Sequence, residues 1–206
     1  MKMKLEGPVV FIGASSVYGR CDTEEGGFVH RFRMWLESQQ LKNTKVYNLG
    51  ISGNNTNDYL ERMSEEIIPR NPRLIIWSLG SNDCKRVEDK NNPPDIFEDL
   101  YKKNIKKIIE KSLEIADTIF IGVYPIDDSK TTPIQGKDIY YLLYEVIKYE
   151  NIAKEICKEN EIPYLDIMSK WLKIDYNSYL AEDGLHANAK GHAEIYKELR
   201  IFLKNL

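Results

Sequence analysis

The chain has 206 residues, of which 42% are hydrophobic and 30% are charged, and its formal net charge at pH 7 is −3. This length suffices for one full hydrophobic core, so we expect a single domain that spans residues 1–206. A slightly acidic chain lacks the basic excess that supports binding to nucleic acid or to anionic membranes. No apolar stretch is long enough to cross a bilayer, so we expect no membrane partner.

The three cysteines, Cys21, Cys84 and Cys157, are odd in number and include no C-x-x-C pair. This pattern argues against a disulfide framework and against a zinc site, and it favours a reducing compartment. Residues 1–6 contain lysines but no apolar segment that leads to a cleavage site. The sequence therefore predicts no signal peptide and a cytoplasmic location, and it leaves the oligomeric state open.

Short apolar runs alternate with helical patterns along the whole chain. Five runs predict strands, at residues 9–12, 45–49, 74–79, 118–123 and 164–167. Because this alternation is typical of a parallel sheet covered on both faces, we expect an α/β fold with three layers, αβα. Right-handed crossovers leave few possible strand orders, and 2-1-3-4-5 is the order that we expect.

Apolar residues at helical spacing predict the helices that cover the sheet. These helices begin near residues 28 and 59, after Pro94, and at about residues 139 and 188. We expect the following side chains of the last three helices to face inward: Leu100, Ile105, Ile108, Ile109, Leu113, Leu143, Ile147, Ile156, Ala189, Ala193, Tyr196, Leu199 and Leu203. The segments 85–94, 124–138 and 168–182 are predicted to be loops or irregular structure.

A serine pair, Ser15 and Ser16, follows the first strand where the chain must turn. The carboxyl end of a central strand is where open α/β sheets place their chemistry, so Ser15 is a candidate nucleophile. Gly-Ala-Ser-Ser alone is equally typical of an ordinary polar turn. Three later segments make the prediction more specific.

These three segments also lie next to predicted strands or helices. Gly50–Gly53 follows the second strand, Gly80–Asp83 follows the third, and Asp183–His186 precedes the last helix. The carboxyl ends of parallel strands face the same way, so we expect all of these residues to meet in one crevice. Taken singly, Gly80–Asp83 could be a turn with an Asx cap, and Asp183–His186 an N-cap region with a solvent-exposed histidine.

Together the segments resemble the conserved blocks of the SGNH hydrolases, the GDSL-type esterases and lipases. Gly13–Ser16 matches the first block, Gly50–Gly53 the second, Gly80–Asp83 the third and Asp183–His186 the fifth. The resemblance spans almost the whole chain. It implies the flavodoxin-like form of the three-layer fold and a serine hydrolase that cleaves carboxylic esters through an acyl-enzyme intermediate. The family usually has aspartate at position 14, and we expect Ala14 to alter the support of the turn without abolishing catalysis.

The resemblance also implies a role for each matching residue. Ser15 would be the nucleophile, His186 the base that takes its proton, and Asp183 the carboxylate that holds the second ring N–H of the histidine. The oxyanion hole would consist of the backbone N–H groups of Ser15 and Gly53 and the side-chain amide of Asn82. Gly53 suits this place because it has no side chain to block the substrate.

Tyr18, Asp83 and Tyr124 are the residues that we expect to contact the substrate. Polar loops and the lack of a long apolar run favour a small-molecule ester with a short acyl group, such as an acetyl group on a carbohydrate or another small metabolite. The remaining histidines, His30 and His192, lie inside predicted helices and are expected on the surface or in packing. Three histidines without ligand spacing predict no metal, and we expect no cofactor.

Two functions from other classes remain open. One is a non-catalytic protein that binds a small molecule or a carbohydrate on the same fold. The other is a flavin or nucleotide binder, since a fold does not determine function. The turn after the first strand lacks both G-x-G-x-x-G and G-K-[ST], which argues against the second alternative.

Overall fold

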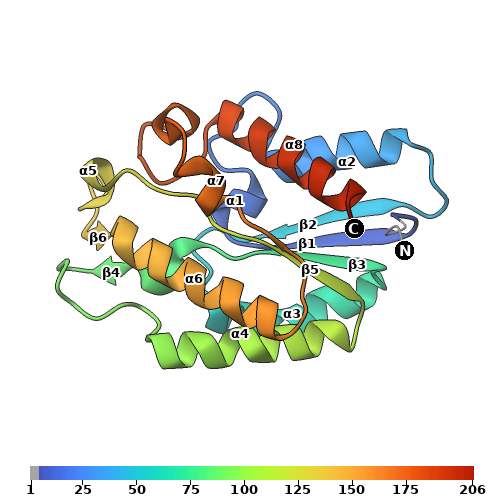
Figure 1. The fold of residues 1–206 in the computed structure, drawn as a ribbon, viewed down its shortest axis with the longest axis horizontal. Helices are drawn as coiled ribbons and strands as arrows, with labels where there is room; N and C mark the ends of the chain where they lie inside the picture. Colours follow the sequence, from blue (N-terminus) through green and yellow to red (C-terminus); the bar gives the residue numbers. More distant parts are fainter. Residues whose placement is uncertain (1–4) are drawn as a thin grey trace.

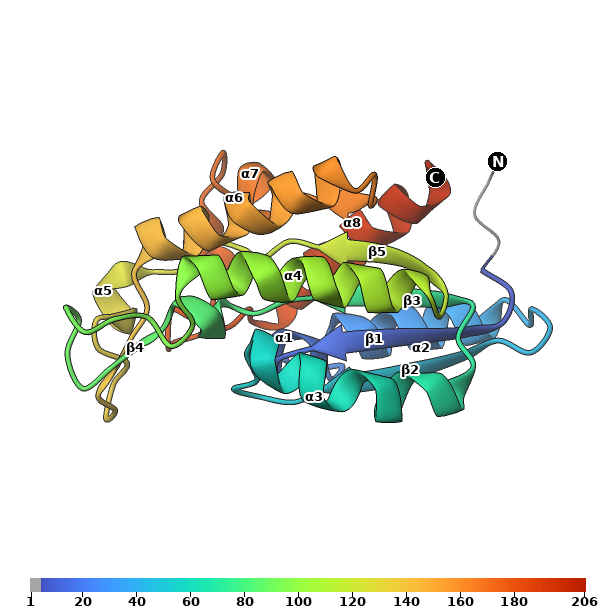
Figure 2. The same cartoon turned by 90° about the horizontal axis from the view of Figure 1, so that it is seen from below.

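A computed structural model describes residues 5–206 and shows one parallel sheet between two layers of helices (Figures 1 and 2). The strands of this sheet are β1 (Pro8–Gly13), β2 (Lys45–Gly50), β3 (Leu74–Ser78), β5 (Asp117–Ile121) and β7 (Tyr164–Leu165). Their spatial order is β2-β1-β3-β5-β7, and every neighbouring pair is parallel. The predicted α/β class and the predicted order 2-1-3-4-5 are confirmed. Residues 1–4, on which the absence of a signal peptide partly rests, lie outside the described part.

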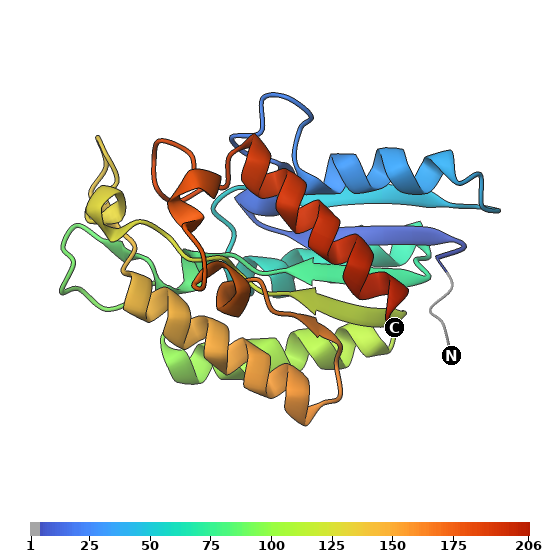
Figure 3. The same ribbon diagram turned by 45° about the horizontal axis from the view of Figure 1, so that its top comes forward.

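Five long helices cover the two faces of the sheet. The helices α3 (Thr56–Ile67), α4 (Glu98–Leu113) and α6 (Leu143–Glu159) lie on one face, and α2 (Phe28–Ser38) and α8 (Ala189–Lys204) lie on the other (Figures 1 and 3). The strand β3 shows how this arrangement forms two cores. Its side chains alternate, so Ile75 and Trp77 pack with α3, α4 and α6, whereas Leu74 and Ile76 pack with α2 and α8. Burial on both faces explains its unbroken apolar sequence.

Short elements lie between the long helices and strands, some of them in segments that were expected to be loops. They are α1 (Ser15–Tyr18), η1 (Ile68–Arg70), η2 (Ser81–Cys84), β4 (Arg86–Val87), α5 (Asp128–Thr131), β6 (Ile139–Tyr140), α7 (Met168–Trp171) and η3 (Tyr176–Tyr179). β4 and β6 pair antiparallel and lie with α5 beyond the carboxyl ends of the main strands (Figure 1). The prediction that a helix begins at residue 139 is therefore wrong, because Ile139 and Tyr140 pair with β4 before α6 starts.

Two of the expected core positions on α4 are exposed. Leu100 is 40% exposed and Leu113 is 53% exposed, whereas Tyr101, Ile105 and Ile108 are buried. Leu100 lies five residues before Ile105 and so on another face of the helix, and Leu113 is its last residue. The prediction also extended the fourth strand to residue 123, but the Val123 amide donates to a Glu150 carboxylate oxygen instead of continuing the sheet.

The last helix buries a different set of residues from the expected one. Leu199 and Leu203 are buried as predicted, together with His192 and Ile195, which complete an i, i+3, i+4 stripe. Ala189, Ala193 and Tyr196 are only partly buried. His192 is a packing residue, since its ring stacks on Phe28 at 6.0 Å between centroids, and His30 is exposed. None of the described helices combines the length and the apolar character needed to cross a membrane.

Candidate active site

Ser15 begins the helix that follows the central strand. β1 ends at Gly13, one buried residue intervenes, and α1 starts at Ser15. The helix ends after four residues at Gly19, whose φ of 94° is the left-handed conformation that glycine adopts without strain. The intervening residue is Ala14, and a Cβ built on Gly80 would meet its methyl group at 2.9 Å. Ser15 therefore lies in a short, closely packed turn at the carboxyl edge of the sheet.

The loop that carries His186 is held on both sides of this residue. The Ala181 amide donates to the His186 carbonyl at 2.7 Å, and the Ala187 amide donates to the Tyr124 hydroxyl at 3.0 Å. Asp183 does not cap α8, because the cap is Asn188, whose side chain accepts from the Gly191 amide. The reading of Asp183–His186 as a simple N-cap region is therefore wrong.

The side chains of Ser15, His186 and Asp183 form a hydrogen-bonded chain. His186 Nε2 lies 3.0 Å from Ser15 Oγ, and His186 Nδ1 lies 2.6 Å from Asp183 Oδ2. Burial opposes the charge on Asp183, but hydrogen bonds from the ring and amide of His186 and from the Leu185 amide hold the pKa of its carboxyl well below the usual range. An ionised carboxylate only accepts, so Nδ1 carries the proton and the lone pair of Nε2 faces the serine hydroxyl.

Three potential hydrogen-bond donors lie at this cleft: the backbone N–H groups of Ser15 and Gly53 and the side-chain amide of Asn82. Gly53 has a φ of 89°, and a Cβ built there would meet no atom within 4 Å, so its backbone borders open space. Asn82 lies in η2 and lines the same cleft as Ser15, Gly53 and His186. Among residues 5–206, neither the Ser15 amide nor the Gly53 amide donates a hydrogen bond. These N–H groups are therefore available to a ligand.

The Asn82 amide is held in one orientation. One N–H of its Nδ2 donates to the Asn54 carbonyl at 2.8 Å, and its Oδ1 accepts from the Tyr141 hydroxyl at 2.8 Å. A flipped amide would set its oxygen against the Asn54 carbonyl, and two acceptors cannot bond to each other. The second N–H of Nδ2 bonds to no described residue, so it too is available to a ligand.

Tyr141 is the residue at this site that sequence reasoning missed. It follows β6 and is fixed by Thr131, because the Tyr141 amide donates to the Thr131 carbonyl at 2.9 Å and the Thr131 hydroxyl donates to the Tyr141 carbonyl at 2.7 Å. It is one of 13 tyrosines, and its segment was predicted to be helical. Its contact with Asn82 joins residues 59 positions apart, so no local signal marks it.

Ser15 lies between two hollows of different size. The inner hollow is narrow, with a cavity volume of about 30 Å³, whereas the outer cleft has about 1000 Å³. The two share Ser15, Asn82, Tyr141, Leu185 and His186. The inner hollow continues between the strand ends toward Gly122 and Tyr124, whereas the outer cleft opens between the polar loops.

The three residues expected to contact substrate occupy three different settings. Tyr124 lines the inner hollow, but its hydroxyl bonds to Ser16 at 2.9 Å and to the Ala187 amide, so it also supports the site. Tyr18 is 63% exposed and lines neither hollow. The expectation for Asp83 needs correction: it is 1% exposed, and its Oδ1 accepts from the amide and hydroxyl of Thr56. Asp83 therefore joins η2 to the start of α3 and does not face the cleft.

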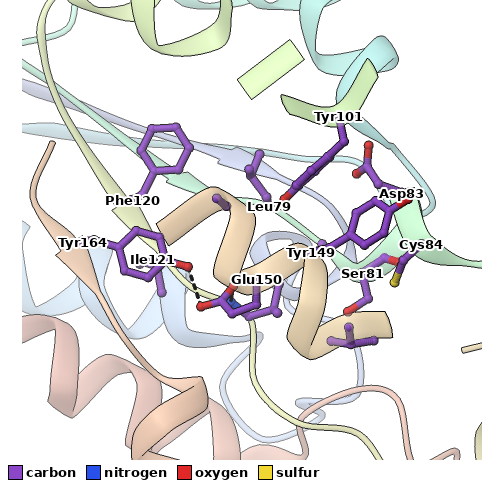
Figure 4. A pocket seen from close by; sticks show the side chains of 14 residues that line it. Leu79, Ser81, Asp83, Cys84, Tyr101, Phe120, Ile121, Tyr149, Glu150 and Tyr164 are labelled. Carbon is purple, nitrogen blue, oxygen red and sulfur yellow. Dashed lines mark hydrogen bonds between the residues drawn. The ribbon is translucent and has the colours of Figure 1, made fainter. Parts of the chain in front are cut away.

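A third hollow, with a cavity volume of only about 10 Å³, lies behind η2 and includes neither Ser15 nor His186 (Figure 4). Asp83 and Glu150 both line it, and burial raises the pKa of each carboxyl to about 7. Glu150 accepts from the Tyr164 hydroxyl, as Figure 4 shows, and from the Val123 amide. Asp83 Oδ2 is buried without a described partner, so this carboxyl carries a proton near neutral pH far more readily than Asp183.

Comparisons with known proteins agree with this architecture. An acetylxylan esterase from Geobacillus stearothermophilus is 24% identical over 169 residues, which is 79% of this chain and 72% of that protein. The uncharacterized protein YpmR of Bacillus subtilis is 24% identical over 209 residues, which is 93% of this chain and 79% of YpmR.

Two solved structures share the fold. A lipase/acylhydrolase from Enterococcus faecalis superposes with a TM-score of 0.77 at 19% identity, over 97% of this chain and 96% of that one. The acetylxylan esterase Axe2 from Geobacillus stearothermophilus gives 0.76 at 20% identity, over 98% and 96%. The family model described as GDSL-like lipase/acylhydrolase matches residues 11–194. Because this match covers most of the sequence, the chain belongs to the GDSL-like lipase/acylhydrolase family.

Proposed function

We propose that the protein hydrolyses carboxylic esters through an acyl-enzyme formed on Ser15. The observation that carries this proposal is the continuous chain from Ser15 Oγ to His186 Nε2 at 3.0 Å and from His186 Nδ1 to Asp183 Oδ2 at 2.6 Å. His186 takes the hydroxyl proton as Ser15 attacks the ester carbonyl, and Asp183 stabilises the imidazolium that forms. The protonated ring then delivers this proton to the leaving alcohol. Water releases the acyl group in a second, equivalent step.

Negative charge develops on the carbonyl oxygen during both attacks. In our proposal the N–H groups of Ser15 and Gly53 and the free N–H of Asn82 bind this oxygen, each contributing on the order of 3 kcal/mol to transition-state stabilisation. Tyr141 is a positioning residue, because its hydroxyl keeps the Asn82 oxygen turned away from the cleft. The lack of other partners for these three N–H groups among the described residues supports this role, because the donors need not break a bond when the charge appears.

The two hollows support a short acyl group and a larger, polar alcohol. The inner hollow is far smaller than the outer cleft, and strand ends and Tyr124 close it. The outer cleft is lined by polar and charged loop residues such as Arg20, Gln135 and Lys137, which suit a hydroxylated group. We therefore propose acetyl esters of a carbohydrate or another small metabolite as substrates, in line with the acetylxylan esterases to which the chain is similar.

A panel of nitrophenyl esters with acyl chains of increasing length tests this assignment. The proposal predicts the highest kcat/KM for the acetyl ester and a steep fall beyond butyryl. Acetylated and deacetylated xylo-oligosaccharides, followed by release of acetate, test the alcohol side. A preference for long acyl chains would contradict the short-acyl assignment, and hydrolysis that persists in Ser15→Ala would contradict the mechanism. A protein that binds the oligosaccharides but hydrolyses no ester would favour the non-catalytic alternative.

A further inference from the structure

Cys21 lies beside Asp183 and His186, in a loop that buried neighbours hold in place. Cys21 follows α1 and has a φ of 68°, a left-handed conformation that costs a residue with a side chain on the order of 1 kcal/mol. On one side of it, His192 Nε2–H donates to the Arg20 carbonyl at 3.0 Å. On the other, the buried Asp22 carboxylate accepts from the Gly27 amide and from Arg31. The strained position of Cys21 is thus maintained by buried neighbours on both sides.

The thiol, a carboxylate oxygen of Asp183 and a ring nitrogen of His186 converge. These three atoms all lie within 4.8 Å of one another, and all three residues are partly exposed. Burial and the Asp183 charge raise the pKa of the Cys21 thiol, so without a metal this group is a neutral S–H and does not compete with Ser15 as a nucleophile. Asp183 and His186 also line the outer cleft, through which an ion can enter.

Thiolate, imidazole and carboxylate are the ligand types that zinc prefers. A tetrahedral zinc ion with ligands at about 2.0–2.3 Å holds its ligand atoms roughly 3.5 Å apart. The cluster is close to this arrangement: the 2.6 Å contact between Asp183 and His186 must open, and a separation at the 4.8 Å limit would have to close by about 1 Å. Three protein ligands leave the fourth position for water. Hard cations such as Mg²⁺ prefer six oxygen ligands and do not match this set.

We propose that Cys21, Asp183 and His186 form an inhibitory binding site for a soft divalent cation, with Zn²⁺ as the ion that fits it best. Binding converts the Cys21 S–H into a metal-bound thiolate and releases the proton to solvent. The coordinating ring nitrogen uses its lone pair, so a proton on Nδ1 shifts to Nε2 and the ring stays neutral. The consequence for activity rests on the proposed function: the metal occupies the base and its orienting carboxylate, so Ser15 loses its proton acceptor.

Metal binding is measured first without reference to activity. The reduced full-length protein is titrated with Co²⁺, which reports thiolate ligation through a near-ultraviolet charge-transfer band, and Zn²⁺ then competes for the site. We expect one ion per chain in the wild type and in Ser15→Ala. Cys21→Ser and Cys21→Ala should lose the band and at least about tenfold in Zn²⁺ affinity, while Cys84 and Cys157 remain present in both variants. An unchanged band or unchanged affinity in these variants would overturn the site.

Inhibition is measured on nitrophenyl acetate with Zn²⁺, with Mg²⁺ and after addition of a chelator. We expect reversible inhibition by Zn²⁺ only, with an inhibition constant at least about tenfold higher in Cys21→Ala, whose activity without metal is close to that of the wild type. Zn²⁺ that binds through Cys21 without inhibiting would overturn the inhibitory role. If the protein hydrolysed no ester, the proposed function would fail, and the Co²⁺ spectra would still decide whether the metal site exists.

Discussion

Two aspartates near the active site show how the surrounding backbone determines what a carboxylate can do. The loop before α8 presents Asp183 with the His186 ring and with the amides of Leu185 and His186, which hold its pKa well below the usual range. The η2 turn buries Asp83 and leaves its Oδ2 without a described partner, and this burial raises its pKa to about 7. The same residue type is therefore a permanent charge in one region and a titrating group in the other.

The difference follows from what each region must do. In our account Asp183 must stay ionised to stabilise an imidazolium, so it receives several donors in a loop that is open to the cleft. Asp83 bonds to the amide and hydroxyl of Thr56 and so connects the turn that carries Asn82 with the helix that follows Gly53. It is buried and lines neither the inner hollow nor the outer cleft. Substitutions at the two sites should therefore have different effects.

The largest effect is expected from replacing Ser15, the first residue of the proposed catalytic chain. Ser15→Ala removes the nucleophile and should lower kcat/KM for nitrophenyl acetate by at least about 10⁴-fold, with binding of a product carbohydrate preserved. The matched control is Ser16→Ala, which removes a neighbouring hydroxyl that bonds to Tyr124. We expect this control to lose less than about tenfold. Similar losses in the two variants would mean that the turn, and not the Ser15 hydroxyl, is what activity requires.

Replacing Asp183 and Asp83 by asparagine, one at a time, tests whether the two carboxylates differ in function. Asp183→Asn keeps the size of the side chain but cannot stabilise the imidazolium, so kcat should fall by about 10³–10⁴-fold. Asp83→Asn retains an oxygen that can accept from Thr56, so kcat/KM should change by less than about tenfold. Steady-state kinetics on purified, folded variants measure both. Comparable losses of kcat in the two variants would show that the two carboxylates do not differ in function.

A smaller effect is expected at Tyr141, which in our proposal acts through Asn82. Asn82→Ala should lower kcat by about 10²–10³-fold. Tyr141→Phe removes only the hydroxyl that orients the amide and should lower kcat by about tenfold with little change in KM. If Tyr141 acts through Asn82, the double variant should be no slower than Asn82→Ala alone. Additive losses in kcat would show that Tyr141 acts by another route. Tyr149→Phe, which removes a buried hydroxyl bonded to the Ile96 carbonyl, is the control.

Asp83→Asn is expected to have the smallest effect on activity, but it should change how stability depends on pH. Asp83 has a pKa of about 7 in the folded protein and about 3.9 in an unfolded chain. Between these values the folded state holds the Asp83 proton more tightly, so the Asp83 contribution to the free energy of unfolding falls as pH rises from about 4 to 7, by up to about 4 kcal/mol. Asp83→Asn should flatten this decline in urea unfolding at pH 5 and pH 8. An unaltered decline would show that Asp83 is ionised throughout.

The sequence predicted the sheet because its inner strands β1, β3 and β5 are apolar runs that are buried on both faces, and such runs are recognisable locally. The approach of Ser15, Asp183 and His186 could be predicted from the resemblance and from the rule that parallel strands place their carboxyl ends together. Tyr141 and Cys21 could not, because each meets its partner across a long stretch of chain. The burial of Asp83 was missed because Gly80–Asp83 reads equally well as a turn that is open to solvent.

The most direct test of the account is to find which residue becomes covalently modified by a serine-directed fluorophosphonate. The protein is incubated with the reagent, digested and analysed by mass spectrometry, in parallel with Ser15→Ala and His186→Ala. The account predicts one adduct per chain, on Ser15, absent in Ser15→Ala and formed far more slowly in His186→Ala. An adduct on another residue, or labelling of Ser15 at the same rate without His186, would contradict it.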